Sequence, residues 1–265
     1  MCIRDRFNLI FRSYIKNRLN SRFLNEKMKI AVLTKAIPSY ESSIRVDSSG
    51  SWIDESVVNY VVNESDSYAL EEALQIKESS GEGSEVVVVT LGSEANTSKV
   101  IKDGLAKGAD RGIFIKNESS TTDPLTVAKI FADNLKSENF DLILSGLQSD
   151  DMGSGQTGVL IGELLEMSTA TLAIETQVEG DKIKVKRELE SGWFQWVTLP
   201  FPASISIQSG INEPRYPSLK GIMGAKRKEL NTLESSSESQ KQSFVNLYVP
   251  KNEKVTEKIE GDADT

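Results

Sequence analysis

Short apolar runs of strand length alternate with amphipathic segments through the first two thirds of the chain. The clearest run covers 85–92, which is built largely from valine and ends in glycine, and comparable runs cover 29–34, 112–115 and 142–144. Unbroken apolar runs of this length are typical of strands that a parallel sheet buries on both faces. The pattern therefore predicts a mostly parallel central sheet.

The segments between these runs have helical periodicity. Alanine and leucine recur at helical spacing in 68–77, where Ser65 or Asp66 is the expected N-cap and the helix ends near Gly81. A second helix is expected to stop at Gly108, and Pro124 stands at the start of a third, where proline is common. At least four strand–helix repeats predict a Rossmann-like α/β fold, with helices flanking both faces of the sheet.

The pattern changes after about residue 170. Strand-like segments at 169–178, 182–189, 194–199 and 203–207 predict an antiparallel β extension of the same sheet. Residues 44–46 and 51–53, around Gly50, are expected to form a short hairpin. From Asn231 the chain is rich in Ser, Glu and Lys and only 244–249 is apolar, so we expect a flexible, extended C-terminal tail that wraps a partner.

These changes divide the chain into 1–27, an α/β domain at 28–208, a loop and helix at 209–230, and the tail at 231–265. Residues 1–27 carry seven Lys or Arg against Asp5 and Glu26. They are either a targeting peptide, which would send the protein to the mitochondrial matrix, or upstream sequence read from a misplaced start codon. We favour the second interpretation, for a cytoplasmic bacterial protein, because Met28 directly precedes the first strand. Neither interpretation places these residues in the fold.

The composition excludes several kinds of chemistry. The 265 residues include no histidine and one cysteine, Cys2. Histidine triads, Cys/His zinc sites, iron–sulfur clusters held by this chain alone and internal disulfides are therefore ruled out. Binding, or chemistry done by a bound cofactor, becomes the favoured class. The net charge of −8 argues against a nucleic-acid partner, and no apolar run approaches the ~20 residues needed to cross a membrane.

A glycine-rich loop follows the apolar run at 142–144. The segment 146–158 reads GLQSDDMGSGQTG and leads directly into a further apolar, helix-like stretch. Glycines let a backbone approach a ligand closely, and the N–H groups that open a helix attract anions. The loop is thus a candidate nucleotide cradle, although it matches neither GxGxxG nor GxxxxGK[ST] and an ordinary strand-to-helix connection is the alternative. Ligands of parallel sheets bind beyond the strand C-termini, where loops 34–39, 63–66 and 90–93 would join it.

Three segments resemble the β subunit of the electron transfer flavoproteins. They are Asn63 with the run ALEEAL at 69–74, the loop 146–158, and NEPRYPSL at 212–219 with the Ile222-Met223 and Ala225-Lys226 pairs that follow. The resemblance spans about 28–230. It implies a heterodimer with an α subunit, whose mobile C-terminal domain carries most of the FAD, while the β subunit holds AMP in a structural role.

The resemblance also implies site residues. Two residues are placed near the FAD, Tyr40 and Glu188, where a loop aromatic and a solvated strand charge are the alternatives. Asp66 departs from the small or apolar residue expected at its position. The implied AMP contacts are Leu33, Asn63, Glu64, Ser65, Asp66, Leu91, Gly146, Leu147, Gln148, Ser149, Asp150, Asp151, Met152, Gly153, Ser154, Gly155, Gln156 and Thr157.

The third segment is similar to the family's recognition loop, in which one leucine enters a hydrophobic pocket of a partner dehydrogenase. Leu219 is that leucine here, and the alternative is that it only closes a helix cap against the body of the protein. An exposed leucine with apolar neighbours and a charged rim would form a small binding hot spot. The implied recognition residues are Arg215, Tyr216, Leu219, Ile222, Met223 and Lys226.

The resemblance implies an electron carrier subunit rather than an enzyme. Such a protein takes electrons from flavin dehydrogenases, for example the acyl-CoA dehydrogenases of fatty acid oxidation, and passes them to electron transfer flavoprotein–quinone oxidoreductase and the respiratory chain. Three alternatives stay open. They are an electron-bifurcating form with FAD in place of AMP, a homodimeric stress-type AMP sensor, and an ATP-hydrolysing or ligating enzyme in which Asp150 and Asp151 hold Mg²⁺.

Overall fold

The computed structural model describes residues 27–80, 82–118, 123–235, 240–250 and 261. It divides the chain into two compact units, one formed by Met1–Ser39 with Tyr60–Ser243 and one by Tyr40–Asn59 with Phe244–Thr265. The interpretations of residues 1–26 lie outside the described part. Within that part, none of the helices combines the length and the apolar character that crossing a bilayer requires.

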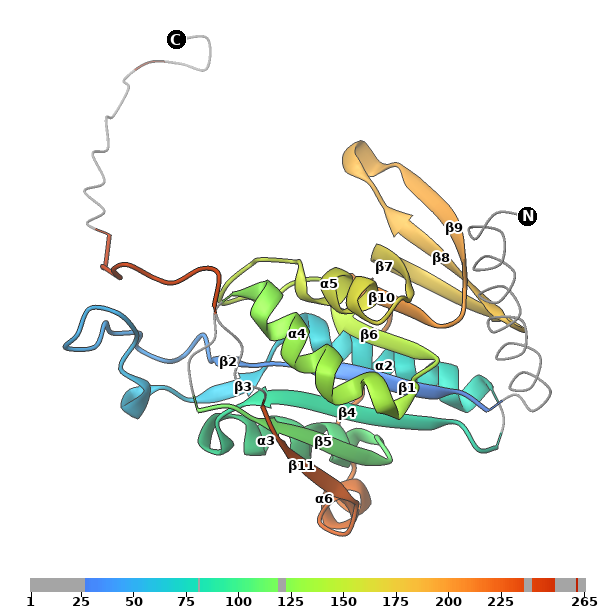
Figure 1. The fold of residues 1–265 in the computed structure, drawn as a ribbon, viewed down its shortest axis with the longest axis horizontal. Helices are drawn as coiled ribbons and strands as arrows, with labels where there is room; N and C mark the ends of the chain where they lie inside the picture. Colours follow the sequence, from blue (N-terminus) through green and yellow to red (C-terminus); the bar gives the residue numbers. More distant parts are fainter. Residues whose placement is uncertain (1–26, 81, 119–122, 236–239, 251–260, 262–265) are drawn as a thin grey trace, which may run out of the picture. The chain divides into compact units, whose positions relative to one another are not determined.

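A nine-stranded sheet forms the centre of the first unit, in the order β11-β5-β4-β1-β6-β10-β7-β8-β9 (Figure 1). The seven strands from β11 to β7 pair in parallel, and β8 and β9 continue the sheet antiparallel. β2 (Ala36–Pro38) and β3 (Tyr60–Val62) form a separate small sheet. The strands of the large sheet are β1 (Lys29–Thr34), β4 (Glu85–Gly92), β5 (Arg111–Lys116), β6 (Leu142–Gly146), β7 (Ser168–Glu179), β8 (Lys182–Glu188), β9 (Phe194–Pro200), β10 (Ala203–Ile207) and β11 (Leu230–Glu234).

Helices cover both faces of this sheet, so the predicted Rossmann-like α/β architecture is confirmed (Figure 1). Ile30 and Val32 of β1 contribute to a core with α2 and α3, whereas Ala31 and Leu33 contribute to a second core with α4 and α5. This alternation follows from the strand period of two. The helices are α2 (Glu64–Ser79), α3 (Glu94–Lys107), α4 (Pro124–Leu135), α5 (Thr157–Leu164) and α6 (Leu219–Ala225), with short 3-10 turns η1 (Glu55–Val57), η2 (Lys136–Glu138) and η3 (Glu190–Gly192).

Three expectations about the elements are corrected. The segment Ala203–Ile207 is not antiparallel: β10 lies between β6 and β7 and pairs in parallel with both. The tail does not leave the sheet at Asn231, because Leu230–Glu234 forms β11 and pairs in parallel with β5. Helix α2 begins at Glu64 with Asn63 as its N-cap, so Ser65 and Asp66 lie in its first turn.

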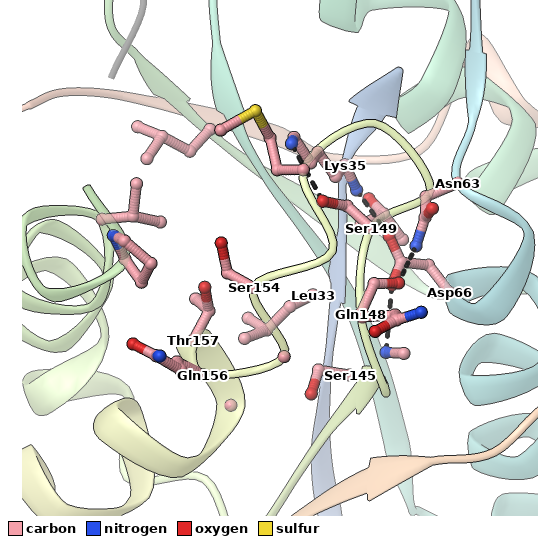
Figure 2. A pocket seen from close by; sticks show the side chains of 18 of the residues that line it. Leu33, Lys35, Asn63, Asp66, Ser145, Gln148, Ser149, Ser154, Gln156 and Thr157 are labelled. Carbon is pink, nitrogen blue, oxygen red and sulfur yellow. Dashed lines mark hydrogen bonds between the residues drawn. The ribbon is translucent and has the colours of Figure 1, made fainter. Parts of the chain in front are cut away.

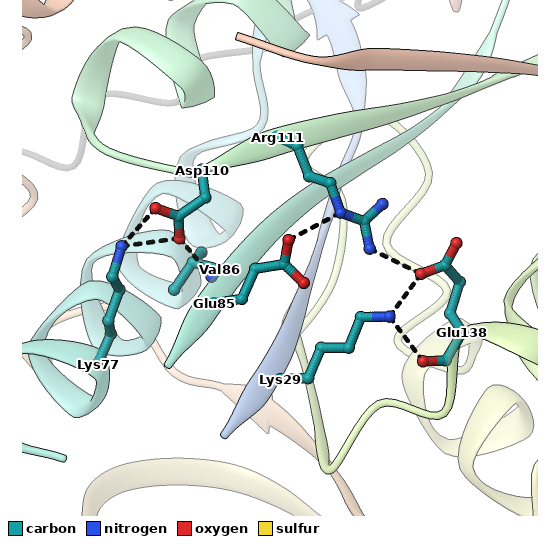
Figure 3. A network of polar contacts seen from close by, with 7 residues as sticks. All are labelled: Lys29, Lys77, Glu85, Val86, Asp110, Arg111 and Glu138. Carbon is teal, nitrogen blue, oxygen red and sulfur yellow. Dashed lines mark hydrogen bonds and ion pairs between the residues drawn. The ribbon is translucent and has the colours of Figure 1, made fainter. Parts of the chain in front are cut away.

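A polar network ties together the N-terminal ends of β1, β4 and β5 (Figure 3). Arg111 Nε lies 2.9 Å from Glu85 Oε1, its Nη2 lies 2.7 Å from Glu138 Oε2, and that same oxygen is 2.7 Å from Lys29 Nζ. Asp110 accepts from the Val86 N–H and from Lys77. Charges at this end of the strands are thus paired with one another.

The second unit is small. Val46 and Ile53 form an isolated antiparallel bridge, which confirms the predicted hairpin around Gly50. The Trp52 and Phe244 rings lie 5.7 Å apart, and the Leu247 N–H donates to the Gly50 carbonyl at 2.8 Å. The apolar stretch of the tail therefore orders against this hairpin.

Candidate functional site

A cavity of about 180 Å³ lies beyond the C-terminal ends of β1, β4 and β6. A single water molecule needs roughly 10–15 Å³ by the same measure, so the cavity has room for an organic ligand. Figure 2 shows Ser154, Gln156 and Thr157 on one side of it, and Lys35, Asn63 and Asp66 on the other. This is the crevice in which doubly wound sheets bind their ligands.

The cavity has an apolar wall and a polar wall. Leu33 and Leu91 each stand one residue before the end of a central strand, and the first two turns of α4 add Pro124, Val127 and Phe131. The loop between β6 and α5 supplies the polar wall. A ligand with one flat apolar part and one polar or charged part fits such a site.

Ser145 lies at the floor of the cavity with an unsatisfied hydroxyl. It is 7% exposed, and its Oγ has no hydrogen-bond partner in the described part of the chain. Gly158 allows this approach, since a Cβ at residue 158 would overlap Ser145 Oγ. A buried hydroxyl without a partner is costly, so Ser145 is suited to bonding a ligand.

Helix α5 points its N-terminus toward the same cavity. Its N-cap residue, Gln156, makes no side-chain capping bond, and Gln156, Thr157 and Gly158 all line the cavity. The first N–H groups of a helix carry partial positive charge and need acceptors. The polar wall is therefore suited to a phosphate group.

The first turn of α2 fixes the loop that forms the polar wall. Asn63 Nδ2 donates to the Gln148 carbonyl at 3.0 Å, and Asn63 Oδ1 accepts from the Asp150 N–H at 3.0 Å. Ser65 Oγ donates to the same Gln148 carbonyl at 2.7 Å. These bonds join residues more than 80 positions apart, and they hold the loop in place before any ligand binds.

Asp66 joins three elements with one buried carboxylate. Its Oδ2 accepts from the Lys35 N–H at 2.8 Å, and its Oδ1 accepts from the Gly146 N–H at 3.0 Å. Burial raises the pKa of Asp66 from its usual 3.8 to about 7, although the hydrogen bonds from Lys35, Asn63 and Gly146 oppose the shift. The acidic side chain that departs from the family pattern thus braces the loop.

Replacing Asp66 by asparagine is expected to remove a pH dependence from folding. The folded chain holds the Asp66 proton between about pH 4 and 7 whereas the unfolded chain has released it, so this contribution to the free energy of unfolding is lost as pH rises through that window. One proton gives a slope of at most about 1.4 kcal/mol per pH unit. Urea unfolding of both proteins from pH 4 to 9 checks this, and a wild-type–D66N difference that does not change with pH contradicts it.

Lys35 lines the cavity and bonds two side chains of the loop. Its Nζ lies 2.6 Å from Asp151 Oδ1 and donates to Ser149 Oγ at 3.1 Å. Asp151 is thereby neutralised by a lysine, and within the described ranges no group of three or more acidic, cysteine or histidine side chains could hold a metal ion. Asp151, one of the two aspartates of the Mg²⁺ alternative, is thus already paired with Lys35 in this structure.

Most residues expected to contact AMP line this one cavity, while Glu64, Ser65, Asp150, Asp151 and Gly153 do not. Sequence reasoning missed the α4 wall, because Val127 and Phe131 read as ordinary core positions. It also did not name Ser145 and Asn117, which lie at or just beyond the ends of β6 and β5, although the predicted loops 34–39, 90–93 and 146–158 already included Thr34, Lys35, Gly92 and Gly158. The additional lining residues are Thr34, Lys35, Gly92, Asn117, Pro124, Val127, Phe131, Ser145 and Gly158.

The two residues expected near the FAD do not line this cavity. Glu188 ends β8, where its Oε2 accepts from Gln208 Nε2 at 3.0 Å. Tyr40 belongs to the second unit and is 78% exposed. Their proximity to a flavin stays a prediction.

Residues 212–226 form an exposed segment that ends in α6. Ser218 caps the helix by accepting from the Gly221 N–H at 3.0 Å. Leu219 is 76% exposed, Met223 67% and Ile222 48%, so Leu219 does not close a cap against the body. We call Leu219, Ile222 and Met223 the apolar tip. Tyr216 and Lys226 are also exposed.

Arg215 anchors this segment instead of contributing a free charge to its rim. Its Nε lies 2.7 Å from Glu71 Oε2 and its Nη1 lies 2.6 Å from Glu78 Oε1, both on α2. The hydrogen bonds that Arg215 donates to Glu71 and Glu78 raise its pKa. Gly221 packs so closely on α3 that a Cβ there would overlap the Ala106 carbonyl oxygen. These contacts with α2 and α3 therefore hold the apolar tip in a fixed position.

Comparison with known proteins decides the family. A sequence model of the electron transfer flavoprotein domain matches residues 51–238. The chain belongs to the electron transfer flavoprotein β-subunit family. It is 43% identical over 203 residues to the electron transfer flavoprotein subunit beta of Bradyrhizobium diazoefficiens, covering 77% of this chain and 80% of the relative. The corresponding subunits of Methylophilus methylotrophus and Homo sapiens are 37% identical over 206 residues and 33% over 210, covering 77% and 78% of this chain and 78% and 81% of those relatives.

Membership of the electron transfer flavoprotein family confirms the resemblance seen in the sequence. The matched range includes the loop 146–158 and the exposed segment 212–226. Both features therefore belong to a protein of flavin-associated electron transfer.

Proposed function

We propose that the chain binds AMP in the cavity beyond β1, β4 and β6, and that it works with an α subunit as a soluble electron carrier. The observation that supports AMP most directly is the unpartnered Ser145 hydroxyl beside the uncapped start of α5. In this proposal the phosphate lies at the N-terminus of α5. The adenine lies against Leu33, Leu91 and the α4 wall.

The AMP has a structural role in this proposal. Asn63, Ser65 and Asp66 already hold the loop through bonds to its backbone. A ligand that bonds the remaining N–H groups would complete this lining and stabilise the folded chain by mass action. In this proposal, no side chain of the cavity makes or breaks a covalent bond.

The electrons are carried by FAD, bound mainly by the α subunit. FAD supplies the one-electron and two-electron redox chemistry that protein side chains do not provide. Tyr40 and Glu188 are proposed to help enclose it. The electrons come from flavin dehydrogenases such as acyl-CoA dehydrogenases and leave through electron transfer flavoprotein–quinone oxidoreductase.

The apolar tip is proposed as the docking site for these dehydrogenases. A few exposed apolar side chains with lysines around them make a small contact, and small contacts suit rapid exchange of partners. Arg215 fixes the tip through α2, so little conformational freedom is lost on docking.

Copurification with the α subunit tests this function. We expect a yellow complex whose FAD is reduced by an acyl-CoA dehydrogenase with its substrate and reoxidised by the quinone oxidoreductase, as followed by flavin absorbance. A complex without flavin, or one whose flavin no dehydrogenase reduces, contradicts the proposal. ATP hydrolysis by the chain alone would favour the enzyme alternative instead.

A further inference from the structure

The turn between α6 and β11 carries a lysine that bonds to the body of the protein. Lys228 is half-buried, whereas Lys226 and Arg227, directly before it, are exposed. The Lys228 ammonium donates to the Leu105 carbonyl at 2.8 Å and to the Ala109 carbonyl at 2.5 Å. A residue that follows the apolar tip by only a few positions is thereby fastened to a distant part of the chain.

The two carbonyls lie at the C-terminal end of α3. The Ala109 N–H would bond the Leu105 carbonyl if the helix continued, but it donates to the Gly104 carbonyl at 3.2 Å instead. The last carbonyls of a helix need donors, and the helix dipole favours a positive charge beside them. Lys228 supplies a donor and a charge together, so it caps α3 and joins it to the turn after α6.

The Lys228 ammonium is partly removed from water. Burial lowers its pKa from the usual 10.5; Asp110 opposes this shift and Lys77 adds to it. Leu105 and Ala109 are both buried, so loss of the ammonium would leave their carbonyls short of a donor, which is costly. The contact is therefore worth more than an ion pair on the open surface.

Helix α6 touches the same part of the chain at two other points. It lies beside α3 (Figure 1), and a Cβ at Gly221 would overlap the Ala106 carbonyl oxygen. Ala225, the last residue of α6, is buried in the core that also contains Leu105. Lys228 extends this contact past the end of the helix. The beginning of α6, its end and the turn that follows it are thus all held at α3.

Helix α6 depends on such contacts for its shape and position. It has seven residues, two of which are glycines. Isolated helices shorter than ~12 residues are marginal in water, and glycine weakens them further. The three residues of the apolar tip are exposed, so packing of the tip itself does not hold the helix. The bonds at α3 have to do so.

We propose that Lys228 is a positioning residue for electron uptake: its bonds to the end of α3 hold α6 in the orientation in which the apolar tip meets a dehydrogenase. Lys228 itself does not touch the dehydrogenase. Arg215 fixes the segment before α6 to α2, and Lys228 fixes the turn after α6 to α3. This inference rests on the proposed function, since that function assigns docking to the tip.

The effect of Lys228 is expected in docking and not in the transfer that follows. A tip that is fixed before docking loses less conformational freedom when the complex forms. Releasing α6 therefore weakens the encounter with the dehydrogenase. Once the partner is bound, the same FAD receives the electrons. The predicted signature is a raised KM with little change in kcat.

A pair of substitutions at neighbouring basic residues tests this role. Lys228→Met removes the ammonium and keeps an unbranched apolar side chain. In the α/β complex we expect it to raise KM for reduction by an acyl-CoA dehydrogenase about tenfold, with kcat changed less than about twofold, because bonds from a charged donor are lost. Arg227→Met removes the same charge from the exposed neighbour and should leave KM within about twofold of wild type. Equal increases in the two variants would make lost charge the cause and would overturn the proposal.

A double substitution tests whether Lys228 acts through the tip. In a Leu219→Ala background the main docking contact is already absent. Residues that act through one another are not additive, so Lys228→Met should raise KM less than about twofold further in that background. The full tenfold effect in both backgrounds would show that Lys228 acts elsewhere, and the proposal would be wrong.

Hydrogen exchange of the assembled complex locates the structural change. Lys228→Met should speed exchange of the α6 amides and leave the first turn of α2 unchanged. Lys228→Arg keeps a cation at α3 and should restore slow exchange and a KM close to wild type. If Lys228→Met fails to assemble, Lys228→Gln, which keeps a neutral donor, takes its place in every comparison. A raised KM with unaltered exchange in α6 would overturn the positioning role.

Failure of this inference and failure of the proposed function give different results. A wild-type complex that is reduced normally, together with a Lys228→Met complex of unchanged KM, refutes the role of Lys228 alone. A wild-type complex whose flavin no dehydrogenase reduces refutes the proposed function as well.

Discussion

Replacing Leu219 by alanine is expected to reduce the efficiency of electron uptake from a cognate dehydrogenase about 30-fold. The side chain is 76% exposed at the start of α6 and is held out by the Ser218 cap and the Arg215 anchor. A central hot-spot residue contributes about 2 kcal/mol or more to binding, and 1.4 kcal/mol corresponds to a factor of ten. Steady-state reduction of the complex, with its concentration varied, should show a raised KM and little change in kcat.

Leu164→Ala provides the control for that result. Leu164 is also an exposed leucine, 40% accessible, but it lies at the end of α5. Its removal should leave KM unchanged, and both variants should retain wild-type flavin content. Unaltered reduction of L219A by every cognate dehydrogenase would remove the docking role of the apolar tip.

Replacing Gly146 by alanine is expected to abolish nucleotide retention and to destabilise the chain. A Cβ at residue 146 would overlap Ser65 Oγ and lie 2.5 Å from Asp66 Oδ1 and 2.7 Å from the Ser65 carbonyl carbon. The added methyl group would separate β6 from the first turn of α2, which positions the loop. Overpacking of this kind costs about 1–3 kcal/mol. Thermal unfolding and nucleotide content after gel filtration measure the two effects.

Gly224→Ala is the matched glycine substitution. A Cβ at residue 224 meets no atom within 4 Å, and the residue lies in α6. This variant should keep its nucleotide and should not lose stability, because alanine favours helix. If G146A retained nucleotide as well as G224A does, the cavity described here would not be the nucleotide site.

The layered fold could be predicted because its signals are local. The valine run of β4 and the helical rows of α2 each indicate their element without reference to the rest of the chain. The strand at Ala203–Ile207 was also predicted, but its parallel pairing with β6 and β7 was not, because a local pattern does not specify which strands become neighbours. Strand β11 gave no apolar signal, because most of its side chains are exposed and backbone pairing with β5 holds it.

The part of the candidate site that has a local sequence signal was predicted, and the part that depends on contacts between distant residues was missed. Glycines marked the loop between β6 and α5. No sequence signal identified the α4 wall, because Val127 and Phe131 also fit the pattern of core positions in an amphipathic helix. Arg215 looked like a free rim charge, since its partner Glu71 lies 144 positions away in the sequence. Contacts between residues so far apart in the sequence cannot be predicted from periodicity or from motifs.

Nucleotide extraction from the purified α/β complex tests the proposed binding of AMP most directly. The complex is denatured, and the released compounds are separated by chromatography and identified by mass. We predict one FAD and one AMP per heterodimer, and loss of the AMP alone in a Gly146→Ala complex that still assembles. A complex that contains FAD but no AMP, or a second FAD in its place, would contradict the assignment of the cavity to AMP.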